Sequence, residues 1–259
     1  MKKALICGVL AVAAVASVGK ICNKLESWYF TRPQAEGASP GWHGGFDLMD
    51  FNTFYLGDES QKEIFLTFDE GYENGYTEKI LDVLKEKNVQ AAFFVTKPYI
   101  KENVDLVRRM VDEGHIVGNH TVRHKSSPSL SVEEMQAEIT GVEEYFKEMT
   151  GAEMPKFFRP PMGEYSQSVL RTVQDMGYAT IFWSFAYMDW DRDKQPTPEI
   201  AHKKVVEGGL HNGAIWLLHA VSSANAAAMG DVIDSARAAG FEFRSLYQLV
   251  QPHWPPKIS

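Results

Sequence analysis

Short apolar segments alternate with longer amphipathic segments from Lys62 onward, and this alternation is the strongest constraint on the fold. The apolar segments have the length of strands. The segments between them carry apolar residues three and four positions apart, as at Ile80, Leu81 and Leu84. Such repetition is typical of an α/β fold whose parallel strands are buried on both faces. It favours a distorted (β/α) barrel of about seven parallel strands. The predicted strands span residues 63–68, 90–95, 115–118, 156–158, 179–183, 214–218 and 241–243.

Local signals support the helices between these strands. Ser131 and Glu134 have the spacing of a capping box, and Thr197 followed by Pro198 is typical of the start of a helix. Glycine stands where the preceding helix should end, as at Gly151.

The overall charge excludes one class of partner. The chain has 259 residues, enough for one large domain, with 26 Lys and Arg against 34 Asp and Glu, a formal net charge of −8. An acidic surface of this kind repels polyphosphate, so we expect no nucleic acid partner.

The N-terminus has the pattern of an export signal. Two lysines precede an apolar run over residues 4–19, which is short for a membrane-spanning helix of roughly 20 residues. Residues 1–25 are therefore predicted to be a signal peptide cleaved near residues 14–17, or else an uncleaved anchor that is the only contact with a membrane. Both cysteines, Cys7 and Cys22, lie in or beside this segment, so no disulfide framework is expected in the body. The remaining predicted regions are a linker or wrap-around segment at 26–61, the main domain at 62–250 and a C-terminal tail at 251–259.

Polar side chains follow most of the predicted strands directly. Taken singly, each has an ordinary structural explanation, because a histidine after an apolar run is often a satisfied core residue and an aspartate there often caps a helix. In a barrel, however, the C-terminal ends of the strands meet at one rim, where functional residues gather. The residues concerned are Asp69, Glu70, Asn119, His120, His124, Arg159, Asp189, Trp190 and His219.

Two histidines and two carboxylates in this set suggest a metal site. If residues 120–124 form one helical turn, His120 and His124 point the same way, as a two-histidine metal site requires. An acidic third ligand from the first strand would complete a catalytic set with open positions for water. Of the adjacent Asp69 and Glu70, one could bind the metal while the other takes a proton from the metal-bound water.

The order of the motifs resembles that of carbohydrate esterase family 4, the NodB-like polysaccharide deacetylases. The resemblance covers about residues 62–250, and within the family the segments around these motifs look most like the sporulation de-N-acetylases that help to form muramic δ-lactam in spore cortex peptidoglycan. The motifs are "TFDEG" (67–71), "HTVRH" (120–124), "RPPMG" (159–163), "DW" (189–190) and "LLH" (217–219).

The resemblance implies a role for each matching position. Asp69 corresponds to the catalytic base, His219 to the general acid, and Arg159 to the arginine that positions the base. His120 and His124 correspond to metal ligands, with Glu70 expected as the third, and the metal is expected to be zinc. Asp189 would orient the general acid. The implied substrate-binding residues are Pro160, Met162, Gly163, Tyr165 and Trp190, with the Met162 N–H in the oxyanion hole.

The implied function is hydrolysis of N-acetyl groups from peptidoglycan amino sugars by an exported monomer of the cell envelope or spore cortex. The sequence departs from the family pattern at Glu70 and at Ala186, where most members have aspartate. Two alternatives remain open at this point. The first is a deacetylase acting on chitin or xylan with the same machinery, and the second is a non-catalytic protein that binds cell-wall glycan.

Overall fold

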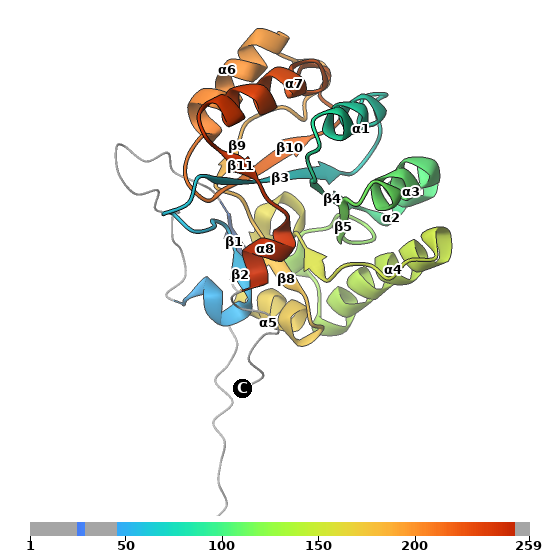
Figure 1. Cartoon of the computed structure of the whole chain (residues 1–259). Coiled ribbons are helices and arrows are strands. Elements are labelled where there is room, and N and C mark those ends of the chain that lie inside the picture. The colour runs from blue at the N-terminus through green and yellow to red at the C-terminus, as the bar shows by residue number, and fades with distance from the viewer. Residues whose placement is uncertain (1–24, 29–45, 252–259) are drawn as a thin grey trace, which may run out of the picture.

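A parallel sheet is the framework of the molecule (Figure 1). The computed structural model of the chain describes residues 25–28 and 46–251. Eight strands of a nine-stranded sheet follow the order β2-β8-β6-β5-β4-β3-β10-β9, and β11 pairs with β3. Every pairing in this sheet is parallel. The strands are β2 (Thr53–Phe54), β3 (Glu63–Glu70), β4 (Ala92–Val95), β5 (Ile116–Asn119), β6 (Phe157–Phe158), β8 (Ala179–Ile181), β9 (Phe185–Ala186), β10 (Ala214–His219) and β11 (Glu242–Phe243).

The sheet curls into a half-barrel. In the part of the chain that the structure describes, the end strands β2 and β9 do not pair with each other, so the ladder stays open. The prediction of an α/β fold with parallel strands is confirmed, and each of the seven predicted strands is present. The two-residue strands β2 and β9 were not predicted, nor was a separate antiparallel pair, β1 (Glu26–Ser27) with β7 (Glu164–Tyr165).

Helices connect the strands, and most of them cover the outer face of the sheet, with α6 and α7 over the β9–β10 end, whereas α8 packs on the inner face (Figure 1). The capping box of Ser131 and Glu134 is formed, and Thr197 caps the helix that begins at Pro198. The helices are α1 (Thr77–Glu86), α2 (Lys97–Glu102), α3 (Val104–Asp112), α4 (Val132–Thr150), α5 (Gln167–Asp175), α6 (Pro198–Gly209), α7 (Ser223–Ala238) and α8 (Leu246–Val250), with short 3-10 turns η1 (Leu48–Phe51), η2 (Ser127–Ser129) and η3 (Pro161–Gly163).

The two faces of β3 belong to different hydrophobic cores. Leu66 and Phe68 lie in the large outer core with residues of α1 and α7, whereas Phe65 lies in the inner core with residues of β8 and α8. Side chains alternate along a strand, so this pattern places Asp69 on the inner face and Glu70 on the outer face.

The described part of the predicted wrap-around segment packs against the sheet. Phe51 and Phe54 are buried, and β2 pairs with β8, so the sheet begins before residue 62. The Trp28 indole N–H also donates to the Trp183 carbonyl oxygen at 2.9 Å. The predicted leader lies outside the described residues except for residue 25, and so does the predicted tail after residue 251. Among the helices that are described, none has the length and apolar character to cross a membrane.

Candidate active site

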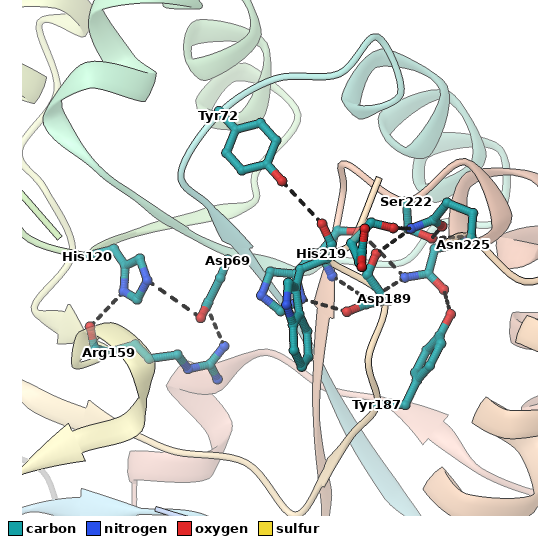
Figure 2. Close-up of polar contacts among 12 residues, drawn as sticks. Asp69, Tyr72, His120, Arg159, Tyr187, Asp189, His219, Ser222 and Asn225 are labelled. Atoms are coloured by element: carbon teal, nitrogen blue, oxygen red, sulfur yellow. Dashed lines mark hydrogen bonds and ion pairs between the residues drawn. The ribbon is translucent and has the colours of Figure 1, made fainter. Parts of the chain in front are cut away.

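A buried arginine fixes the first carboxylate of the site. Arg159 follows β6, is fully buried, and donates from Nη1 to Oδ1 of Asp69 at 2.8 Å (Figure 2). Its Nε and Nη2 donate to the carbonyl oxygens of Ile181 and Phe182 at 2.9 and 3.2 Å, so the guanidinium is held on both sides. The Asp69 carboxylate is thereby oriented at the carboxyl end of β3.

The charge of Asp69 is set by its neighbours. Burial favours the neutral acid, but Arg159 first, then His120 and His219, outweigh burial and lower the pKa of Asp69 below its ordinary 3.8. Asp69 is therefore ionised at neutral pH and available to accept a proton.

His120 is held as a neutral imidazole with one nitrogen free. Its Nδ1 lies 2.8 Å from the Arg159 carbonyl oxygen, which can only accept, so Nδ1 carries the proton. Burial lowers the pKa of His120 to about 4, and it also lowers the pKa of His124. The unprotonated Nε2 of His120 lies 3.7 Å from Oδ2 of Asp69, and the ring centroids of the two histidines are 4.9 Å apart.

The two histidines converge without a helical turn between them. Thr121 and His124 have φ angles of 71° and 53°, in the left-handed region, so the backbone doubles back after β5. Side chains hold this loop, because Asn119 Oδ1 accepts the Thr121 N–H at 3.0 Å and Thr121 Oγ1 accepts the His124 N–H at 3.1 Å. The rings meet as the spacing of four residues indicated, but the backbone between them is a loop and not the helical turn that this reasoning assumed.

Glu70 does not join the histidines. It lies on the opposite face of β3 with no exposed surface, and neither carboxylate oxygen has a hydrogen-bond partner in the structure. Burial, with the charges of Glu73 and Asp69, raises its pKa well above the ordinary 4.5. The expected set of His120, His124 and Glu70 is therefore not formed, because strand alternation points adjacent side chains in opposite directions.

The remaining groups still fit a divalent cation. His120 Nε2 and Asp69 Oδ2 are both acceptors, and two acceptors facing each other at 3.7 Å are stabilised by a cation beside them. Two neutral imidazoles are suitable ligands for zinc and similar ions. Across residues 25–28 and 46–251, however, no three His, Cys, Asp or Glu side chains are grouped closely enough to hold an ion by themselves.

A second carboxylate–histidine pair lies on the neighbouring strand. His219 ends β10, and the parallel register pairs it with Asp69, so both lie on the same face of the sheet. Asp189 is fully buried and accepts from His219 twice, from Nδ1 at Oδ1 (2.7 Å) and from the backbone N–H at Oδ2 (2.8 Å). Burial opposes the charge of His219, but Asp189 outweighs burial and raises the pKa of His219 above 6.5.

Comparisons with known proteins agree with this geometry. A sequence model of the polysaccharide deacetylase family matches residues 56–181. The peptidoglycan-N-acetylmuramic acid deacetylase PdaA of Bacillus subtilis is 37% identical over 93% of this chain and 92% of its own length. Its structure, described as a family 4 carbohydrate esterase, superposes with a TM-score of 0.84 over 90% of this chain and 99% of that one. The chain belongs to the polysaccharide deacetylase family.

Two further structures are similar to this polysaccharide deacetylase. A family 4 carbohydrate esterase from Bacillus anthracis is 41% identical, with a TM-score of 0.73 over 89% of this chain and 98% of that one. The protein BA3943 of Bacillus anthracis, described as a family 4 pseudoenzyme, is 28% identical, with a TM-score of 0.71 over 76% of this chain and 68% of that one. The fold alone therefore does not decide whether a member of the family is active.

Only part of the predicted substrate-binding set of this deacetylase faces solvent. Met162, at φ 58° in η3, and Trp190 are 55% and 49% exposed. Pro160, Gly163 and Tyr165 are buried, and Tyr165 packs on Phe182 with ring centroids 5.1 Å apart. These three residues lie beneath the surface of the loop that carries Met162. An aromatic side chain in a strand is as common in a core as in a sugar groove, so a substrate-binding role for Tyr165 stays a prediction.

Exposed aromatic side chains line the rim next to His219. The Trp190 ring lies edge-on to the His219 ring at 5.7 Å, and the Tyr72 hydroxyl donates to the Trp190 carbonyl oxygen at 3.2 Å. The Arg192 guanidinium lies over the Tyr72 ring at 4.8 Å. Such an aromatic surface can stack on a sugar ring beside the acid group.

Proposed function

We propose that this deacetylase removes the N-acetyl group of N-acetylmuramic acid in peptidoglycan, the step that leads to muramic δ-lactam in the spore cortex. One observation carries the proposal. Asp69 and His219 occupy paired positions on adjacent strands, one with its pKa lowered and the other with its pKa raised. A base and an acid in these states are what amide hydrolysis requires. The similarity to PdaA, named for this substrate, supports the choice of sugar.

The residues act in sequence on a bound acetamido group. Asp69, oriented by Arg159, takes a proton from the water that attacks the acetyl carbonyl carbon. The backbone N–H of Met162 is the proposed donor to the tetrahedral oxyanion. His219 then protonates the departing amine nitrogen from Nε2, since an amide anion leaves poorly, and Asp189 stabilises the imidazolium at Nδ1. Acetate and a free amino sugar result.

A divalent ion, which we expect to be zinc, would be held by His120 and His124 and would supply Lewis-acid polarisation of the attacking water. The orientation of His120 through its Nδ1 bond to the Arg159 carbonyl supports this assignment. Removal of Glu70 from the ligand set leaves fewer protein ligands than the sequence predicts, so the ion should exchange readily with chelators.

A non-catalytic wall-binding protein is the main alternative, and BA3943 is a precedent for such a loss within the fold. A protein that only binds glycan needs neither the lowered pKa of Asp69 nor the pKa of His219 that Asp189 raises. A chitin or xylan deacetylase would use the same groups and differ in its loops.

We further propose that the protein is exported to the cell envelope or spore cortex, through its N-terminal segment, and acts there as a monomer. All groups invoked in the mechanism come from one chain. This location would bring the site to its glycan substrate.

Acetate release tests the proposal. Purified protein is incubated with cortex peptidoglycan, chitin oligosaccharide and acetylated xylan, with and without zinc, and acetate and glycan masses are followed. We expect loss of acetyl from muramic residues in cortex glycan. Asp69→Asn should reduce the rate by at least about a hundredfold while the protein remains folded. Further loss of water from the product would indicate lactam closure.

The controls separate the alternatives. His120→Ala should lower both bound zinc and turnover. Absence of acetate release from every glycan, with the fold intact and zinc supplied, would support the binding protein instead. Release from chitin or xylan but not from cortex glycan would replace the proposed substrate.

A further inference from the structure

We propose that Asn225 is a positioning residue for the acid step, acting through Asp189 on His219. The inference rests on the proposed function, because it concerns the same proton transfer. Asn225 lies in the first turn of α7, outside the five sequence motifs. Figure 2 shows its side chain between Asp189 and Tyr187.

Asn225 supplies the third hydrogen bond to the Asp189 carboxylate. Oδ1 of Asp189 accepts from His219 Nδ1, and Oδ2 accepts from the His219 backbone N–H. The Asn225 Nδ2 donates to the same Oδ2 at 2.6 Å. Both Asp189 and Asn225 are buried, so water cannot easily replace a lost donor.

The orientation of the Asn225 amide is fixed from its other side. The Tyr187 hydroxyl donates to Asn225 Oδ1, which leaves Nδ2 to face Asp189. The reversed amide would place its oxygen against a carboxylate, which is repulsive. The backbone is held as well, because the Asn225 N–H donates to Ser222 Oγ, the cap of α7, at 3.1 Å.

The chemical consequence concerns which ring nitrogens of His219 carry protons. A neutral donor satisfies the Asp189 carboxylate without cancelling its charge, so Asp189 can still stabilise the imidazolium. It also stops the carboxylate from rotating, which keeps the proton on Nδ1 and leaves Nε2 to exchange its proton with the amine. Loss of the donor should slow turnover and leave substrate binding nearly unchanged.

Two substitutions at Asn225 distinguish this role from simple packing. Asn225→Ala removes the donor at every pH. Asn225→Asp keeps the shape, and its new carboxyl can donate to Asp189 only while it is protonated. We expect kcat to fall about tenfold or more in both variants near neutral pH, with KM within about twofold of wild type. As the pH is lowered, the activity of Asn225→Asp relative to wild type should rise, whereas that of Asn225→Ala should stay constant.

Further variants provide the controls. Tyr187→Phe frees the amide and should lower kcat by a smaller factor in the same way. Asn212→Ala removes an amide that donates to the Glu59 backbone carbonyl at 2.8 Å, and should leave kcat and its pH profile unchanged.

A readout without turnover tests the inference separately from the function. In proton–nitrogen NMR spectra, assigned with His219→Gln and recorded at a pH where the imidazole is neutral, the wild-type His219 should show a single Nδ1–H tautomer, and Asn225→Ala and Tyr187→Phe should show a mixture. A wild-type tautomer and wild-type kcat in both folded variants would overturn the inference. Equal losses at every pH in Asn225→Ala and Asn225→Asp would also overturn it, since that result indicates packing. If the wild-type protein is inactive but the variants show the expected tautomer change, only the proposed function is contradicted.

Discussion

Two neighbouring carboxylates, Asp69 and Glu70, have opposite electrostatic states because they point to opposite faces of one strand. Asp69 faces Arg159 and two histidines, which lower its pKa. Glu70 faces the outer core, where burial and the charge of Glu73 raise its pKa. A shift of strand register by one residue would exchange the two roles, so the register of β3 determines the chemistry of the site.

Replacing Glu70 with glutamine should make stability less dependent on pH. The folded pKa of Glu70 is raised above 4.5, so the folded state holds a proton that the unfolded state releases. Stability is therefore retained below pH 4.5 and lost as the pH rises toward the folded pKa, at about 1.4 kcal/mol per pH unit. Glu70→Gln removes this loss, so its free energy of unfolding relative to wild type should increase with pH in urea titrations.

The control is Glu102→Gln, at an exposed position, which should follow the wild-type curve. Zinc content measured on the same samples adds a second test. Glu70→Gln should retain wild-type zinc, and a variant that loses zinc would return Glu70 to the ligand set.

At the level of single residues, the motifs located Asp69, Arg159 and His219 because each directly follows a predicted strand. They could not indicate the direction of Glu70, since both residues of an adjacent pair look equally suitable in sequence. Asn225 was missed because its contact depends on how α7 docks behind β10. The only local signal was Ser222, a helix cap three residues after His219.

At the level of elements, adjacent parallel strands bring distant motifs together. The ladder of β3 and β10 runs in register from Ala214 with Ile64 to His219 with Asp69, so acid and base are placed by backbone hydrogen bonds and not by flexible loops. The long strands were predictable from their apolar runs. The strands β2 and β9 were not predicted.

The short strand β2 should nevertheless contribute to stability. Phe54 is 3% exposed and packs in the inner core with Ile181 and Ile215. Phe54→Ala should lower the free energy of unfolding by about 3–5 kcal/mol, because it leaves a cavity in that core. Met49→Ala, at a 40% exposed position in the preceding turn, should change it by less than about 0.5 kcal/mol. Equal effects in denaturant titrations would mean that the segment before residue 62 is not part of the cooperative unit.

At the level of the whole molecule, the net charge affects how the enzyme meets its substrate. The chain carries a formal charge of −8, and peptidoglycan also carries carboxylates, on its lactyl groups and stem peptides. Like charges slow encounter at long range, and salt screens this repulsion over a Debye length of about 10 Å at 0.1 M. The exposed aromatic side chains of Trp190 and Tyr72 interact with the glycan only in direct contact. Salt should therefore have little effect on this part of the binding.

Raising the ionic strength should therefore increase kcat/KM on soluble cortex glycan by about twofold or more between low and physiological salt, with little change in kcat. A neutral chitin oligosaccharide, if it is turned over, should show no such rise. Asp193→Asn, which removes an exposed charge from the loop that carries Trp190, should raise kcat/KM at low salt and leave it unchanged at high salt. A fall of kcat/KM with salt would instead mean that a local cation, such as Arg192 on the rim, attracts the glycan carboxylates and outweighs the net charge.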